Sequence, residues 1–290
     1  DALPISWSGD IFSNVRDSRI AIGQGGQLII NGNLLGGANF NQEGEGTMIF
    51  RGEMISPTTN INNNVREYAV RAGTLLLDYS LNNGSKLSNV ANLRLGGSRR
   101  GGTIILSGGS HQEIVSQTVL EAGANKIYRD SGTSTINLNN NIASTLSGAT
   151  ISFNATADIN TSNTAKTIQT NNGDITLNAD SDGNSAGVLN PDYTTYAAGT
   201  GTLTWRANTV TWDITSNATK PNLTGSRGAF VFESNASTFG QGIDLTNWIV
   251  FPSTLTSLRF GKTTNTSDLN LTATGISVAG PVTIYGGNIG

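Results

Sequence analysis

Apolar residues recur two positions apart along the chain, in short runs separated by Gly, Asn and Ser. The design is clearest in residues 72–153, where a small residue, usually Gly, precedes each alternating run and a turn follows it. The apolar pairs there include Leu75 and Leu77, Leu93 and Leu95, Ile104 and Leu106, Ile136 and Leu138, and Ile151 and Phe153. Successive side chains of a strand point to opposite faces, so each pair lies on one face. No segment has the apolar spacing of a helix, and the pattern predicts many short β-strands.

The alternating runs also restart at similar intervals. Leu28 and Met48 begin two such runs 20 residues apart, and Leu75 and Leu93 begin two that are 18 apart. Such intervals suit one solenoid turn of two or three short strands, with Gly and Asn at corners that need positive φ. We therefore predict an all-β chain folded as a β-solenoid. Residues 139–141, all Asn, are a candidate for side chains stacked along its axis, with a surface turn as the alternative.

The pattern divides the chain into four segments. Residues 1–24 are interpreted as an N-terminal cap or irregular start, and residues 25–190 as the main solenoid. Residues 191–260 hold three of the four tryptophans and are interpreted as an aromatic-rich insertion or a thicker part of the solenoid. Residues 261–290 return to solenoid coils and stop in mid-pattern. Because the chain also begins with Asp rather than Met, we expect it to be part of a longer or processed protein.

Composition narrows the class of protein. Hydrophobic residues make up 36% and charged residues 13% of the chain, and the formal net charge is −3. Disordered chains are usually highly charged, so a thin core repeated many times fits better than disorder. The absence of cysteine excludes disulfides and thiolate chemistry. No apolar run reaches the roughly 18 residues of a membrane helix, and no basic patch suits nucleic acid, so neither a membrane nor nucleic acid is an expected partner.

The amino-acid sequence of residues 72–153 resembles a known repeat. The stretches GTLLLDYSLNNGSKLSN, LRLGGSRRGGTIILSGGSHQEIVSQTVLEAGANKI, SGTSTINLN and GATISFN resemble the autotransporter-associated β-strand repeat of large bacterial surface proteins and some phage tail proteins. The C-terminal stretch SDLNLTATGISVAGPVTIYGGNIG is similar to the short repeats of filamentous-haemagglutinin-type adhesins. These resemblances imply a right-handed parallel β-helix, export from the cell, and roles in adhesion or surface filaments. They imply no shared catalytic residues.

The expected function is therefore that of a non-enzymatic structural or adhesive segment of a secreted or cell-surface bacterial fibre. The expected location is extracellular or on the bacterial cell surface. Expected partners are glycans or proteins of a host or neighbouring cell, together with end-to-end self-association into a filament. Two alternatives stay open: a tailspike-like polysaccharide depolymerase built on a β-helix, and a passive glycan-binding module in residues 191–260.

Two tryptophans are the candidate glycan-binding residues. Trp205 and Trp212 flank a turn at Ala207 and Asn208, which could present both rings together. Exposed indole rings stack on sugars. The alternative is that the rings cover the apolar interior, because large aromatic side chains are usually mostly buried.

One loop is the candidate metal site, and no other cofactor is expected. Asp180, Asp182 and Asn184 place oxygen side chains at alternate positions beside Gly183, as in a calcium loop. The match is partial, because there is no third Asp and Pro191 occupies the twelfth position. A polar turn between coils is the alternative.

No catalytic residue is predicted. His111 is the single histidine, and its neighbour Ser110 would point to the opposite face of a strand, whereas a triad needs converging groups. We expect His111 to be an exposed loop residue. The acidic residues are too scattered along the chain to nominate a catalytic pair.

Overall fold

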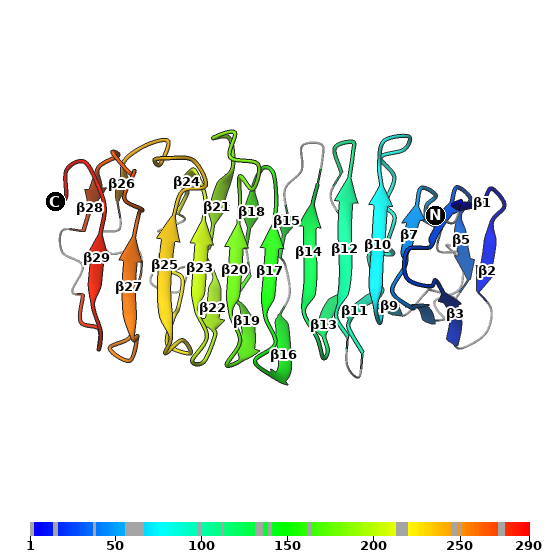
Figure 1. The fold of residues 1–290 in the computed structure, drawn as a ribbon, viewed down its shortest axis with the longest axis horizontal. Coiled ribbons are helices and arrows are strands. Elements are labelled where there is room, and N and C mark those ends of the chain that lie inside the picture. The colour runs from blue at the N-terminus through cyan, green and yellow to red at the C-terminus, as the bar shows by residue number, and fades with distance from the viewer. Residues whose placement is uncertain are drawn as a thin grey trace. The chain divides into compact units, whose positions relative to one another are not determined.

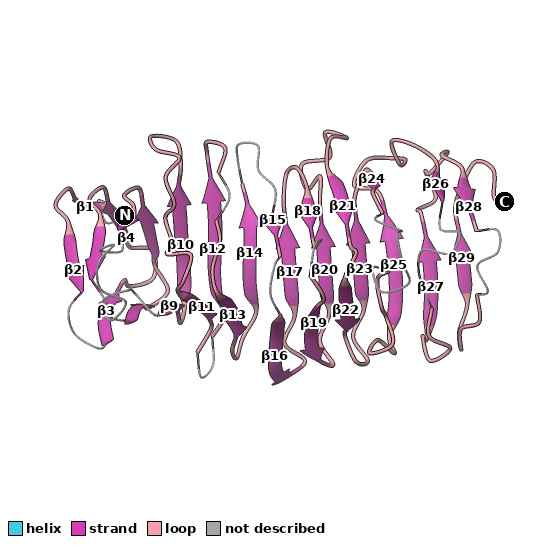
Figure 2. Cartoon of the chain, turned by 180° about the vertical axis from the view of Figure 1, so that it is seen from behind, coloured by secondary structure: helices cyan, strands magenta, loops and turns pink. Residues whose placement is uncertain are grey.

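The chain folds as a β-solenoid made of parallel strands. The structure, a computed structural model, describes residues 3–13, 17–36, 39–55, 67–97, 100–111, 113–130, 136–138, 141–161, 164–212, 220–244, 249, 251–271 and 276–290. All regular secondary structure of the described residues is strand (Figures 1 and 2). Contacts group the chain into two compact units, Asp1–Ser134 and Thr135–Gly290, which are described separately. The predicted all-β solenoid is confirmed.

The first unit contains fourteen strands among its described residues. They are β1 (Ile5–Trp7), β2 (Ile11–Ser13), β3 (Asp17–Ala21), β4 (Gln27–Ile30), β5 (Leu34–Gly36), β6 (Asn39–Glu43), β7 (Thr47–Phe50), β8 (Met54–Ile55), β9 (Glu67–Val70), β10 (Gly73–Asp78), β11 (Asn92–Leu95), β12 (Gly102–Ser107), β13 (Gln117–Leu120) and β14 (Asn125–Arg129).

The second unit contains fifteen strands among its described residues. They are β15 (Ile136–Asn137), β16 (Ile142–Ser147), β17 (Ile151–Asn154), β18 (Ile159–Asn160), β19 (Lys166–Asn171), β20 (Ile175–Asn178), β21 (Val188–Asn190), β22 (Thr194–Ala197), β23 (Leu203–Arg206), β24 (Thr209–Val210), β25 (Ala229–Glu233), β26 (Ile243–Asp244), β27 (Ser257–Phe260), β28 (Leu269–Asn270) and β29 (Val282–Ile284).

Three sheets form the sides of the first unit. In spatial order they are β1-β4-β7-β10-β12-β14, β2-β5-β8 and β3-β6-β9-β11-β13. A coil is one complete turn of the solenoid, and each of the first three coils contributes one strand to each side, as β4, β5 and β6 do. The side made by β2, β5 and β8 ends at β8, because the next two coils carry loops rather than strands at that place.

The register of these strands corrects the predicted length of one coil. Leu28 pairs with Met48, and Met48 pairs with Leu75, so equivalent positions lie 20 and 27 residues apart. Leu75 pairs with Ile104 rather than with Leu93, which belongs to another sheet. The predicted interval of 18 was wrong because consecutive strands of the sequence lie on different sides of the solenoid.

The second unit repeats this plan. One side is β17-β20-β23-β25-β27-β29, and others are β16-β19-β22, β15-β18-β21-β24 and β26-β28. The segment 191–260 belongs to these sheets, since β23 and β25 pair in register with β20 and β27. It is therefore a part of the solenoid with a more aromatic interior, which was one of the two readings of the sequence.

The N-terminal segment contributes strands to all three sides of the first unit. Within residues 1–24, β1, β2 and β3 each pair with the equivalent strand of the next coil. Asn139 and Asn140 lie outside the described residues. Asn stacking does occur elsewhere: the Asn178 side chain donates to Asn154 Oδ1 at 2.7 Å, and the Asn160 side chain donates to Asn137 Oδ1 at 3.3 Å.

Candidate functional site

The two candidate glycan-binding tryptophans differ in exposure. Trp205 lies on β23 in an interior column with Leu177 and Phe232 and is 0% exposed. Its ring centroid is 5.0 Å from that of Phe230 in an edge-to-face contact. Trp212 is only half-buried, with its ring centroid 6.4 Å from that of Trp205. The predicted platform of two presented rings is wrong for Trp205, because a fully buried ring has no face for a sugar.

The side chains of the candidate calcium loop form hydrogen bonds within the loop. Both carboxylate oxygens of Asp180 accept the backbone N–H of Ser185, at 3.0 and 3.2 Å. The Asn184 side chain donates to Asp182 Oδ2 at 2.8 Å, and Asn184 Oδ1 accepts the N–H of Ala186 at 2.9 Å. Burial and the neighbouring Asp182 raise the pKa of Asp180. No cluster of three acidic, His or Cys side chains suited to a metal exists in the described part of the chain.

The polar turn predicted as the alternative describes these contacts. Asp180 is 0% exposed, and its backbone carbonyl also accepts the N–H of Gly183 at 2.9 Å. The oxygens that were candidates for calcium therefore close the turn between β20 and β21. Calcium binding at Asp180, Asp182 and Asn184 stays a prediction.

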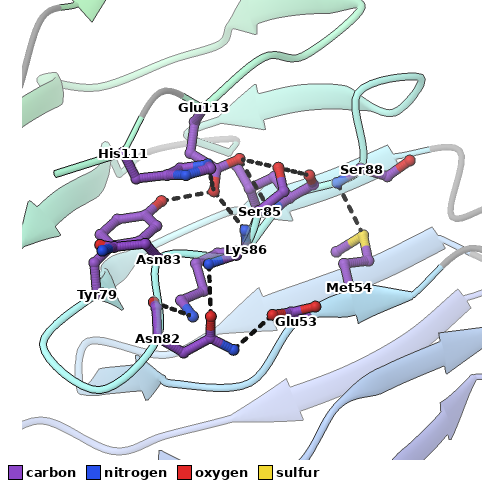
Figure 3. Close-up of polar contacts among 12 residues, drawn as sticks. Glu53, Met54, Tyr79, Asn82, Asn83, Ser85, Lys86, Ser88, His111 and Glu113 are labelled. Carbon is purple, nitrogen blue, oxygen red and sulfur yellow. Dashed lines mark hydrogen bonds and ion pairs between the residues drawn. The ribbon is translucent and has the colours of Figure 1, made fainter. Parts of the chain in front are cut away.

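A densely connected polar cluster lies in the first unit (Figure 3). It joins the loop between β10 and β11 to the loop between β12 and β13, at the side of the solenoid where β8 has no following strand. Its ionisable members are Glu53, Tyr79, Lys86, His111 and Glu113. We call these residues, with Asn82, Asn83, Ser85, Leu87 and Ser88, the loop cluster.

Glu113 is the acceptor at the centre of the loop cluster. Its Oε1 accepts the Tyr79 hydroxyl at 2.6 Å and the Lys86 N–H at 2.5 Å. Its Oε2 accepts the Leu87 N–H at 3.1 Å and the Ser85 hydroxyl at 3.3 Å. The side chain is 9% exposed. Burial raises the pKa of Glu113, while these four donors act in the opposite direction.

Lys86 connects the loop cluster to the preceding coils. The side chain is buried, and its Nζ donates to the carbonyls of Arg51 and Asn82 at 2.9 and 3.0 Å. Burial lowers the pKa of Lys86, and the carboxylates of Glu53 and Glu113 partly oppose this. The ammonium also lies 5.3 Å from the centre of the Tyr79 ring. A flexible side chain is thus fixed between two backbone carbonyls.

His111 is a half-buried member of the loop cluster rather than the predicted exposed loop residue. Its ring stacks on Tyr79, with centroids 5.0 Å apart and planes 19° apart. Its Nε2 is 3.6 Å from Glu113 Oε1, too long for a strong hydrogen bond. Burial, followed by the positive charge of Lys86, lowers the pKa of His111. The lowered pKa disfavours the charged form of the ring and therefore an ion pair with Glu113.

The loop cluster also contacts β8 and the residue before it. The backbone N–H of Ser88 points to the sulfur of Met54 in β8, at 3.3 Å. The Asn82 side chain donates to Glu53 Oε1 at 2.6 Å. These two contacts connect the loop between β10 and β11 to the preceding coil.

The polar groups of the loop cluster bind other groups of the protein and so join neighbouring coils. Catalysis by a carboxylate or amine requires a lone pair or proton directed at substrate. Glu113 directs its oxygens at four protein donors, and Lys86 directs its ammonium at two carbonyls. The sequence did not reveal this junction, because Lys86 and Glu113 lie 27 residues apart, in different coils. The one available signal was that both follow neighbouring strands of one sheet.

Ion pairs on the outer walls also join successive coils. In the first unit, Arg94 contacts Glu67 at 2.9 Å and Glu121 at 2.6 Å. In the second unit, Glu233 lies between Arg206 and Arg259, each at 2.8 Å. These side chains are partly buried but still reach solvent, and a single ion pair at a protein surface contributes little, roughly 0–1 kcal/mol. Because these ion pairs join successive coils, they favour the observed strand register.

Neither a family model, nor a curated protein, nor a solved structure matches the chain. No helix of the described residues has the length and apolarity that membrane crossing requires.

Proposed function

We propose that this chain is a non-enzymatic structural and adhesive segment of a secreted or cell-surface bacterial fibre. The observation that carries the proposal is how the acidic side chains are used. Glu113 binds four donors of a neighbouring loop, and Glu121 and Glu233 each bind two arginines. Carboxylates used in this way hold coils together, and a glycosidase instead needs two of them facing a sugar.

The same proposal gives the chain a location and partners. It acts outside the cell or on the bacterial surface, where glycans or proteins of a host or neighbouring cell are its partners. Many weak contacts along a repeated wall gain strength through multivalency. End-to-end association of copies extends the segment into a filament. A polar chain with a net charge of −3 supports neither nucleic acid nor membrane as a partner.

Protease resistance and self-association test the two parts of this proposal. We expect the folded chain to survive proteinase K for hours under native conditions, because the protease reaches the strands only after the hydrogen-bonded coils open. Digestion at the rate of the urea-unfolded chain would overturn the structural role. Sedimentation velocity over a hundredfold concentration range tests the filament, and a monomer at every concentration would remove that part alone.

A further inference from the structure

A polar groove opens on the second unit across four consecutive coils. Its volume is about 550 Å³, and its lining includes Thr145, Gln169, Asn171, Asn172, Thr200 and Arg227. The lining belongs to β16, β19, the end of β22 and the segment that follows in the next coil. No aromatic residue lines it. The groove is therefore separate from the interior column that holds Trp205.

Small side chains explain why this wall is hollow. Along one outward row, Ala143 pairs with Gln169, and Gln169 pairs with Ala197. Gly225 continues the row, because a Cβ added to it would lie 2.5 Å from the Ala197 Cβ. Only Gln169 is long. The register between β16 and β19 also shifts between Ala143 and Ser147, and such bulges often occur beside binding sites.

Several polar groups of the groove are fixed and others are available. Asn172 Oδ1 accepts the Thr200 N–H at 3.1 Å, and the Asn171 side chain donates to the Thr145 carbonyl at 3.1 Å. The Gln169 amide and the hydroxyls of Thr145 and Thr200 have no hydrogen-bond partner among the described residues, and all three residues are exposed. Amides and hydroxyls on a fixed frame are groups that bind sugar hydroxyls.

Arg227 adds a positive charge to the groove. Its backbone N–H donates to the Gly199 carbonyl at 2.6 Å, which fixes the root of the side chain. The side chain is exposed, and its guanidinium has no acidic partner in the described part of the chain. Arg206 and Arg259, on the same unit, both pair with Glu233. A guanidinium of this kind is suited to bidentate recognition of a carboxylate.

We propose that this groove binds an acidic polysaccharide, with Arg227 paired to a sugar carboxylate. Gln169, Thr145 and Thr200 then hydrogen-bond to sugar hydroxyls. A highly charged polymer such as nucleic acid needs many cations, and this groove offers one. The inference goes beyond the proposed structural role and does not depend on it, because a binding groove could serve a fibre or an enzyme.

Calorimetric titration of the purified chain tests the proposal. The probes are oligogalacturonate, its methyl ester and oligosialic acid, with polyglutamate as an acidic peptide. The variants are Arg227→Gln, which removes the charge, and Ala197→Tyr, which fills the groove. Lys220→Gln is the matched control, since it removes one charge from the same unit at a residue outside the groove lining. Melting temperatures establish that each variant is folded.

We expect the wild-type chain to bind at least one of the two acidic oligosaccharides. If that ligand is oligogalacturonate, the methyl ester binds about tenfold more weakly, because the charged contact is lost. Arg227→Gln weakens binding by a similar factor, Ala197→Tyr abolishes it, and Lys220→Gln leaves it unchanged. Absence of binding at millimolar ligand overturns the proposal, as does unchanged affinity in folded Arg227→Gln. Equal affinity for polyglutamate overturns sugar recognition.

Discussion

Replacing Glu113 tests whether the loop cluster supports the solenoid. Glu113→Ala leaves the Tyr79 hydroxyl and the N–H groups of Lys86 and Leu87 without their acceptor. A buried donor without a partner costs about 1–3 kcal/mol. Ser85 keeps a second acceptor, the Leu87 carbonyl at 3.1 Å. Three unpaired donors therefore predict a loss of at least about 3 kcal/mol in the free energy of unfolding.

Urea unfolding followed by circular dichroism measures this loss, with Glu53→Ala as the control. Glu53 is half-buried and accepts one side-chain hydrogen bond, from Asn82, so its replacement should cost under about 1 kcal/mol. Glu113→Gln keeps the shape but turns an amide toward two of the donors, and we expect an intermediate loss. A Glu113→Ala chain as stable as Glu53→Ala would refute the structural role of the loop cluster.

The pH dependence of stability gives a second measure of the same residue. The pKa of Glu113 is raised in the folded chain, so the folded state holds this proton more tightly than the unfolded state. The part of the stability that comes from this protonation is therefore fully present below the pKa of the unfolded chain and is lost as pH rises through the folded pKa. Between pH 4 and pH 7, the wild-type chain should lose more stability than Glu113→Gln. An identical loss in both chains would contradict the assigned pKa shift.

Three further tests, at Gly201, Trp205 and Lys166, examine other parts of the fold. Gly201→Ala should destabilise by several kcal/mol, because the new Cβ would lie 2.2 Å from the Gly173 carbonyl oxygen, whereas Gly23→Ala meets nothing within 4 Å. A melting curve that is equal for both variants would contradict this register. Trp205→Ala should cost about 3–5 kcal/mol in urea unfolding, and a loss below 1 kcal/mol would show that the ring is not packed. Burial lowers the pKa of Lys166 to about 8, so its unfavourable contribution should disappear as pH rises from about 8 to above 10.5. Lys166→Met should be more stable than wild type at pH 7 by up to about 3 kcal/mol, with the difference shrinking toward pH 10, and a constant difference would refute the shift.

The sequence was sufficient for the fold class because the period of two is a local property. The pairs Leu75 and Leu77, and Ile151 and Phe153, are all buried as predicted. The same rule, applied to Leu203 and Trp205, puts the Trp205 ring in the interior. The glycan-binding prediction for Trp205 was wrong because its spacing from Leu203 already predicted a position in the core.

The length of a coil and the loop cluster could not be read in this way. Coil length depends on loops whose size varies, so Leu75 pairs with Ile104 across 29 residues while Leu28 pairs with Met48 across 20. The loop cluster depends on which coils meet, and Lys86 and Glu113 meet only after the register is fixed. Among the candidate metal ligands, Asp180 accepts hydrogen bonds from its own turn. The spacing of its neighbours in the sequence fits a polar turn and a metal-binding loop equally well.

The most direct test of a non-enzymatic role is the molar mass of an acidic polysaccharide after prolonged incubation with the chain. Light scattering after size-exclusion chromatography would follow polygalacturonate and purified bacterial capsular polysaccharides overnight, alone and with equimolar protein. We predict that the molar mass of every free polysaccharide stays unchanged, with no new reducing ends, whether or not it binds. A falling molar mass would contradict the structural role and would identify the chain as a depolymerase.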